Sequence, residues 1–428
     1  MSANPPDSSS ATAPKPGHAI GWRWLLVVFL VALAARGTWG VRELAASVDP
    51  AGLSFPDEQQ YWQIAESLRT GTGLQDELGF RATRMPLYPA FLSLFVGLPN
   101  GIAAARATHW VAGAIVAVLT AWLAGGLLGR RVGVLAGFWV AIDPLLVFTS
   151  SLLLTETPFM VALLLLWGAI LPLMAHDDYA ARMPRWLGVG IAAALAVYLR
   201  ESSLGLVVLV LLMAVCGRRF DWRRLAGAAL SGVVVIVLLL PWAARNDRTI
   251  GQWCWLTTRG GISLYDGVGP QADGGSDLGD VKQMPAVRGL DEVAWNQYFL
   301  RESWKALRED PARIVRLAGV KLGRLWNPFP NVETHRSPLT MVVSAAWNLP
   351  TFVLAVVGAI LLATRRDYGG VRIAIFLLLP ALYVSMLHGV FVGSVRYRLV
   401  AMPLLEVLAA FAVVTAVDCI RRRSRDVD

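Results

Sequence analysis

The sequence predicts an all-α polytopic membrane protein, a bundle of about ten transmembrane helices. Of its 428 residues, 56% are hydrophobic and only 16% are charged, and the mean hydropathy is +0.53. A soluble domain usually carries about 25% charged residues. The net charge of +9 could indicate nucleic-acid binding, but nearly all the basic residues are arginines in short runs between apolar segments. Such runs are typical of topology determinants, so no nucleic-acid partner is expected.

Ten apolar segments are candidate spans, because a crossing helix needs about 20 largely apolar residues. They are 22–40, 103–128, 132–148, 157–175, 186–200, 202–216, 225–244, 341–363, 373–391 and 399–419, of which the fifth and sixth are short. The preceding residues, 1–21, begin with a stretch rich in Ser, Pro and Ala and are expected to form a disordered cytoplasmic tail.

The arginine runs orient these spans. They fall in alternate connections and after the last span: Arg130 and Arg131; Arg182 and Arg185; Arg218, Arg219, Arg223 and Arg224; Arg365, Arg366 and Arg372; Arg421, Arg422, Arg423 and Arg425. The positive-inside rule makes this face cytoplasmic, with both termini on it. Arg greatly outnumbers Lys and Ala is abundant, as in GC-rich bacterial genomes, so we expect a bacterial inner membrane.

Two long connections then face the periplasm or exterior, 41–102 and 246–340. We call them the first and second long loops. They divide the chain into a transmembrane catalytic core, 22–245, which includes the first loop, then the second loop, then C-terminal spans with a basic tail, 341–428. In the second loop, Asp310-Pro311 predicts the start of an amphipathic helix lying in the headgroup layer.

Two adjacent carboxylates, Asp57 and Glu58, follow Pro56 in the first loop. An acidic pair at a helix start can simply stabilise the helix through a favourable interaction with the helix dipole. Arg84, later in the same loop, favours chemistry instead, because a base and a cation then share one exposed segment. Glu156, at the outer end of its span, fits either a capping acid or a member of the same site.

Several arginines lie at the outer ends of spans, where the positive-inside rule disfavours them. Each could be an interface anchor or part of an ion pair. A phosphate ligand would explain them together, because guanidinium groups bind phosphate well. The expected phosphate-binding residues are Arg84, Arg200, Arg245, Arg396 and Arg398.

Other kinds of site have little support in the sequence. His388 fits a packed or interfacial histidine better than a metal ligand, and no Cys or His cluster has zinc-ligand spacing. There is also no P-loop, dinucleotide glycine fingerprint or nucleophile elbow. Nucleotide-driven and serine-hydrolase chemistry is therefore not expected.

Motifs in a fixed order run along nearly the whole chain. They are Phe55-Pro56-Asp57-Glu58 with Tyr61 and Gly73; Thr83-Arg84-Met85-Pro86-Leu87-Tyr88-Pro89; Leu152-Leu153-Leu154-Thr155-Glu156; Tyr198-Leu199-Arg200; Pro241-Trp242 with Arg245-Asn246; Gly260-Gly261 with Leu264-Tyr265; Asp310-Pro311 with Lys321 and Trp326; and Arg396-Tyr397-Arg398. In this order the chain resembles bacterial members of the dolichyl-phosphate-mannose protein mannosyltransferase family. These are GT-C type membrane glycosyltransferases, related to the aminoarabinose transferases that act on lipid A. Met85, Asp247 and Arg259 depart from the family pattern, which bears on substrate choice.

The resemblance implies a GT-C bundle with interfacial helices in two extracytoplasmic loops. It also implies inverting transfer of a sugar from a polyprenyl-phosphate donor to a hydroxyl of a glycan, lipid or protein acceptor. Membrane lipids are further partners. On this hypothesis Asp57 is the base, and Glu58 and Glu156 orient the acceptor or hold a metal.

The resemblance extends to substrate and metal. Contacts to the substrate are expected from Tyr61, Tyr88, Tyr265 and His388. Whether Asp57 and Glu156 bind a divalent cation, Mg or Mn, stays open, because the family contains both metal-assisted and metal-independent members.

Three alternatives compete with this hypothesis. A lipid or solute transporter would need ionisable or helix-breaking features near the bilayer midplane, whereas the charges here gather at the outer ends. Another lipid-linked glycan polymerase or ligase would share the arginines, but the acidic pair argues against it. A non-catalytic subunit is the third.

Overall fold

The computed structural model describes residues 20–46, 52–175, 182–216, 221–279, 281, 284–333, 336–365 and 368–425. Its α-helices are α1 (Trp22–Ala46), α2 (Pro56–Arg69), α3 (Leu87–Ser93), α4 (Gly101–Leu128), α5 (Arg130–Ile142), α6 (Pro144–Thr149), α7 (Glu156–Ala175), α9 (Met183–Leu199), α10 (Leu204–Val215), α11 (Trp222–Ile250), α12 (Gly260–Val268), α13 (Glu292–Glu309), α14 (Pro311–Leu325), α15 (Pro338–Ala363), α16 (Tyr368–Val390) and α17 (Met402–Arg425). Short 3-10 helices are η1 (Glu201–Ser203), η3 (Pro285–Val287) and η5 (Val395–Ala401). The expected tail, 1–21, lies almost entirely outside the described residues.

The all-α membrane fold predicted from the sequence is confirmed, and no strand occurs within the ranges just given. All ten predicted spans are helical. Seven helices in the described part of the chain are long and apolar enough to cross a membrane: α1, α4, α7, α11, α15, α16 and the η5–α17 segment. The helices α9 and α10 are apolar but shorter. The expected single span 132–148 is instead two helices, α5 and α6.

The break between α5 and α6 is stabilised from both sides. Asp143 Oδ1 accepts hydrogen bonds from the amides of Leu145 and Leu146, each 2.8 Å away, and thereby caps α6. The Arg36 guanidinium, from α1, donates to the carbonyl oxygens of Ala141 (2.9 Å) and Val140 (3.3 Å) at the end of α5. A helix interrupted inside a membrane protein needs such partners, because lipid offers none.

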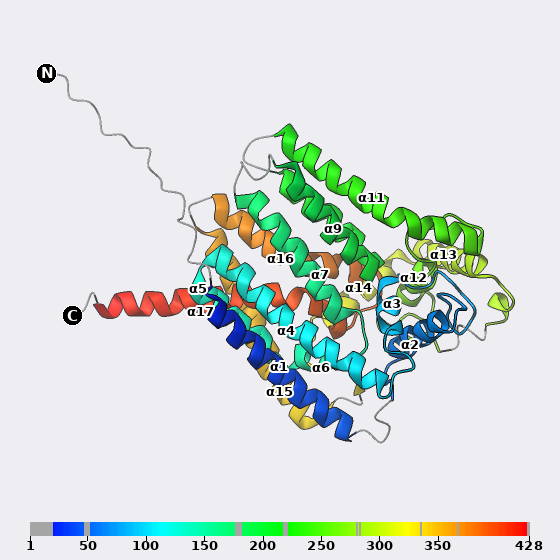
Figure 1. Cartoon of the computed structure of the whole chain (residues 1–428), viewed down its shortest axis with the longest axis horizontal. Helices are drawn as coiled ribbons and strands as arrows, with labels where there is room; N and C mark the ends of the chain where they lie inside the picture. The colour runs from blue at the N-terminus through cyan, green and yellow to red at the C-terminus, as the bar shows by residue number, and fades with distance from the viewer. Residues whose placement is uncertain are drawn as a thin grey trace.

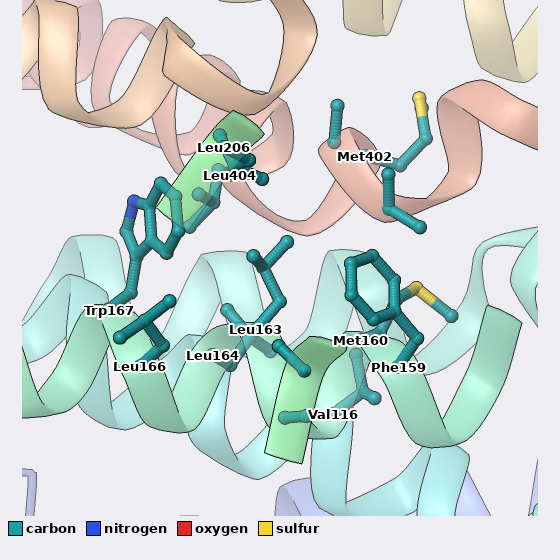
Figure 2. Packing of buried hydrophobic residues seen from close by; sticks show 14 of the residues in the cluster. Val116, Phe159, Met160, Leu163, Leu164, Leu166, Trp167, Leu206, Met402 and Leu404 are labelled. Carbon is teal, nitrogen blue, oxygen red and sulfur yellow. The ribbon is translucent and has the colours of Figure 1, made fainter. Parts of the chain in front are cut away.

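The core lies where α7 meets α4, α10 and α17. Figure 2 shows Phe159 and Trp167 of α7 among side chains of these helices, including Leu206 and Met402. Trp167 stacks on Phe376 of α16, with 5.5 Å between ring centroids. Close side-chain packing of this kind holds membrane helices together, and the positions of the spans in turn fix the loops between them.

The short helices gather at one end of the bundle. Figure 1 shows α2, α3, α12 and α13 together there, while the C-terminal end of α17 projects from the opposite end. Tyr61 of α2 meets Tyr88 of α3 edge to face, 4.9 Å between ring centroids. The predicted helix start at Asp310-Pro311 is confirmed, since Asp310 caps α14 through the Arg313 amide, 2.8 Å away. The two long loops therefore meet at one end, where the polar side chains collect.

Candidate active site

A cavity of about 1420 Å³ lies between the two long loops and the transmembrane helices. One part is polar and includes Asp57, Gln60, Arg259 and Arg396. The rest is largely apolar, with side chains from three helices, α1, α6 and α15: Trp39, Pro144, Leu145, Phe148, Leu339 and Val343. A ligand with a charged head and a hydrocarbon chain fits this division.

Asp57, in the first turn of α2, is held by two guanidinium groups. Its Oδ1 accepts a hydrogen bond from Arg84 Nη2, and its Oδ2 accepts one from Arg396 Nη2, 2.6 Å away. Burial alone would raise the pKa of Asp57, but Arg84, Arg396 and Arg259 hold that pKa well below its usual range. Asp57 is therefore ionised, with both oxygens engaged.

Arg396 also reaches the second acidic residue of the site. Its Nε lies 2.9 Å from Glu156 Oε1, at the start of α7. Arg200 Nη1 lies 3.3 Å from the same oxygen. Glu156 is almost fully buried, with 3% of its side chain exposed. The structure thus joins five of the residues expected from the sequence into one chain of ion pairs, in the order Arg84, Asp57, Arg396, Glu156 and Arg200.

Arg84 and Arg259 meet at Gln60, one turn along α2 from Asp57. Gln60 Oε1 accepts hydrogen bonds from Arg84 Nε at 2.8 Å and from Arg259 Nη1 at 3.0 Å. Tyr61 is also close: its ring centroid lies 4.7 Å from the Arg84 guanidinium carbon. Sequence reasoning missed Gln60 and gave Arg259 no role in binding phosphate. The sequence did mark Arg259 as unusual, because the residue before Gly260-Gly261 departs there from the pattern of the family that the chain resembles.

Charged side chains of both signs surround the polar part of the cavity. The carboxylates close enough to interact with its arginines include Asp57, Glu156, Glu201 and Asp266. Four guanidinium groups face them: Arg84, Arg200, Arg259 and Arg396. Burial, and then repulsion from Arg84, lower the pKa of Arg259. Guanidinium groups of this kind bind phosphate and other anions well.

Glu58 has a different environment from its neighbour. Its Oε1 accepts from the Leu153 amide at 2.7 Å, and its Oε2 accepts from the amides of Ser54 and Phe55, both at 3.1 Å. The side chain is fully buried, and burial raises its pKa against the effect of these amides. Its contacts favour a role in fixing α2 against the segment before α7.

Two of the predicted phosphate-binding arginines contact backbone oxygens. Arg245 donates to the carbonyl oxygens of Arg81 (2.6 Å) and Leu74 (3.4 Å). Arg398 lines the cavity and donates to the carbonyl oxygens of Leu325 (2.9 Å) and Asn327 (2.5 Å). These bonds hold loop segments in place and leave both residues outside the ion-pair chain around Asp57.

The remaining predicted substrate contacts are packed side chains. The Tyr88 hydroxyl lies 3.1 Å from His109 Nε2. Tyr265 packs on Phe299, with ring centroids 5.0 Å apart. His388 stacks on Tyr397, a cavity residue, at 4.2 Å, so it supports the cavity wall from behind.

The carboxylates of the site do not fit a divalent cation. Arg396 lies between Asp57 and Glu156, the two residues considered as metal ligands, and forms an ion pair with each. A metal ion bridging them would have to displace this guanidinium. Within the described ranges, no group of three or more His, Cys, Asp or Glu residues could hold a metal.

No family model matches the sequence, and no curated protein matches it either. Solved structures do match. The archaeal oligosaccharyltransferase AglB from Archaeoglobus fulgidus, in complex with an inhibitory peptide and a dolichol-phosphate, matches with TM-score 0.57 and 14% identity over 95% of this chain and 52% of that one. ArnT from Cupriavidus metallidurans bound to undecaprenyl phosphate matches with TM-score 0.51 and 17% identity, over 91% of this chain and 59% of that one.

A further structure of the Archaeoglobus fulgidus oligosaccharyltransferase, in complex with Zn and sulfate, matches with TM-score 0.58 and 14% identity, over 94% of this chain and 50% of that one. The chain thus spans between half and three fifths of the length of these proteins. At such low identity the likeness shows the fold alone. The chain is a multi-pass membrane protein that shares the GT-C fold with these structures.

Proposed function

We propose that this protein is an inverting glycosyltransferase that moves a sugar from a polyprenyl-phosphate donor to an acceptor hydroxyl. The observation that carries the proposal is the cavity, in which a cluster of arginines around one carboxylate opens into an apolar tract. A lipid-linked sugar phosphate has the same two parts. As a phosphodiester it carries one negative charge, which guanidinium groups bind well.

Lipid phosphates in two matched structures support this assignment. The AglB structure contains a dolichol-phosphate and the ArnT structure contains undecaprenyl phosphate. In this chain the corresponding isoprenoid would lie along the side chains of α1, α6 and α15. Its phosphate would lie against Arg84, Arg259 and Arg396, which meet at Asp57 and Gln60.

The chemistry requires a base and charge stabilisation. In the proposed step the acceptor oxygen attacks the anomeric carbon and the bond from that carbon to the phosphate oxygen breaks. The acceptor proton passes to Asp57, and the arginines stabilise the charge on the departing phosphate. Inversion follows from a single displacement. No general acid is needed, because the leaving phosphate is already an anion.

Asp57 is a weak base while two arginines hold it. A donor phosphate would compete with Asp57 for these guanidinium groups and so raise its pKa toward the usual range. The base then becomes effective only when the donor is bound. Ordered binding, with the donor first, is the kinetic consequence.

The charge pattern of the loops supports an extracytoplasmic site in a bacterial inner membrane, with both termini cytoplasmic. Under this proposal residues 22–245 supply Asp57, Glu156 and the first loop. The second loop, 246–340, supplies Arg259, and the C-terminal part supplies Arg396.

The test is transfer by the purified full-length protein in liposomes that contain polyprenyl-phosphate sugars and a panel of glycan, lipid and peptide acceptors. The expected result is transfer that Asp57→Asn abolishes, with helical content and detergent elution unchanged. Near-normal transfer by Asp57→Asn would contradict the role of Asp57. Absence of transfer and of donor binding by the unsubstituted protein would contradict the function.

A further inference from the structure

Glu292, in the first turn of α13, reaches across from the second long loop to the first. Its Oε2 accepts a hydrogen bond from the Arg81 amide at 2.6 Å, and its Oε1 accepts one from the Ala82 amide at 2.8 Å. The side chain is buried, with 7% exposed. Sequence reasoning gave this residue no role, because nothing in the sequence relates it to residues 210 positions earlier.

The same carboxylate also holds the segment that carries Arg259. Glu292 Oε1 accepts a hydrogen bond from the Thr258 hydroxyl. The Thr258 amide in turn donates to the carbonyl oxygen of Ala82, 2.9 Å away. Three donors from two loop segments therefore converge on one side chain, and a direct backbone bond joins the segments.

Each clamped segment leads directly to an arginine of the site. Arg84 follows Ala82 by two residues, and Arg259 follows Thr258 by one. Both arginines donate to the same acceptor, Gln60 Oε1, at 2.8 and 3.0 Å. The spacing of two guanidinium groups beside Asp57 thus depends on how firmly these two segments are joined.

We propose that Glu292 is a positioning residue that sets the distance between Arg84 and Arg259 and so shapes the phosphate-binding part of the site. This role rests on the proposed function, since it assigns Arg84 and Arg259 to the donor phosphate. Glu292 acts through these segments, because both oxygens of its carboxylate accept hydrogen bonds from them.

Glu292→Gln weakens the clamp with the least change in shape. An amide offers one oxygen where the carboxylate offers two, so its NH₂ group must face an N–H donor of Arg81 or Ala82. Asp291→Ala is the matched control. Asp291 caps the same helix through the Ala294 amide at 2.7 Å, and that bond involves only α13.

The first readout is hydrogen–deuterium exchange of the full-length protein, which needs no substrate. In Glu292→Gln, peptides covering 79–86 and 256–262 should both lose protection, whereas in Asp291→Ala only the first turn of α13 should do so. Unchanged protection of both peptides in Glu292→Gln would overturn the clamp, whether or not the protein transfers sugar.

The second readout is binding of undecaprenyl phosphate, with transfer kinetics where transfer occurs. Loss of one charge-assisted hydrogen bond weakens binding by roughly tenfold or more, so we expect Glu292→Gln to weaken lipid-phosphate binding by about that factor. The KM for the donor should rise more than the KM for the acceptor. Asp291→Ala should leave both unchanged. Equal binding by Glu292→Gln and the unsubstituted protein would overturn the positioning role, whereas no binding by either would count against the proposed function instead.

Discussion

The guanidinium of Arg396 lies 2.6 Å from the carboxylate of Asp57, although 339 positions separate the two residues in the chain. The pair joins the start of α2 to the 3-10 helix η5 before α17. It therefore ties the first long loop to the C-terminal spans. Because Arg396 also pairs with Glu156, a single guanidinium joins Asp57 to Glu156.

Arg396→Gln should abolish activity and also destabilise the protein. The substitution leaves Glu156 buried with Arg200 as its remaining ion-pair partner, at 3.3 Å. Breaking a buried ion pair costs about 3–5 kcal/mol. We expect a clearly lower unfolding temperature in detergent and a loss of transfer of roughly 100-fold or more.

Arg131→Gln is the control for this substitution. Arg131 also forms an ion pair with an aspartate, Asp418, at 2.7 Å, but 67% of its side chain is exposed. Exposed pairs contribute about 0–1 kcal/mol. Equal stability and activity losses for Arg396→Gln and Arg131→Gln would contradict the importance of the buried network.

The ion pairs of Asp57 should make the free energy of unfolding depend on pH in the acidic range. The folded-state pKa of Asp57 is depressed, so its contribution is complete above the unfolded pKa, about 3.9, and is lost as the pH falls below that value. The stability difference between the unsubstituted protein and Asp57→Asn should shrink by roughly 1.4 kcal/mol per pH unit below about pH 4. Thermal unfolding between pH 7 and pH 3 measures it, and a constant difference over that range would refute the ion-pair account.

Glu58→Ala should affect folding more than chemistry. The Glu58 carboxylate accepts hydrogen bonds from three backbone amides, and the substitution removes this shared acceptor. Each unsatisfied buried group costs about 1–3 kcal/mol. We expect a marked fall in unfolding temperature, while kcat per folded molecule changes by less than about tenfold. A large fall in kcat at unchanged stability would instead assign Glu58 to the chemistry, as the sequence suggested.

Arg259→Gln and Arg245→Gln should separate phosphate binding from loop support. Arg259 lines the cavity and shares Gln60 with Arg84, whereas Arg245 donates to backbone oxygens of the first loop. A charge-assisted hydrogen bond contributes about 1.5–3 kcal/mol. Loss of Arg259 should therefore weaken binding of undecaprenyl phosphate by roughly tenfold to 100-fold, and loss of Arg245 should lower stability alone. Calorimetric titration in detergent distinguishes them, and the reverse result would restore the phosphate role that the sequence gave Arg245.

The fold was largely predictable because spanning helices are long and apolar, a signal that depends on composition alone. The break at Asp143 was not predicted. Its polar partners come from other helices, Arg36 on α1 and Trp347 on α15, whose indole nitrogen lies 2.8 Å from Asp143 Oδ2. A sequence without an alignment gives no indication of such pairs.

The site was predictable in part. Asp57 and Arg84 were singled out as an acid and a cation in one loop. Glu156, Arg200 and Arg396 were singled out because charges at span ends are costly, and the structure brings all five together. The same reasoning also selected Arg245 and Arg398, which bind backbone oxygens. The cost of a charge at a span end shows that it needs a partner but does not show which partner it has. Gln60 and Glu292 were missed because polar residues in an aqueous loop carry no such cost.

The most direct test of the central claim is a cryo-EM structure of the protein in nanodiscs with undecaprenyl phosphate. The account predicts a phosphate within hydrogen-bond distance of Arg84, Arg259 or Arg396, beside Asp57, with the isoprenoid chain lying along α1, α6 and α15. A lipid phosphate bound away from these arginines, with the cavity around Asp57 filled only by water, would contradict it.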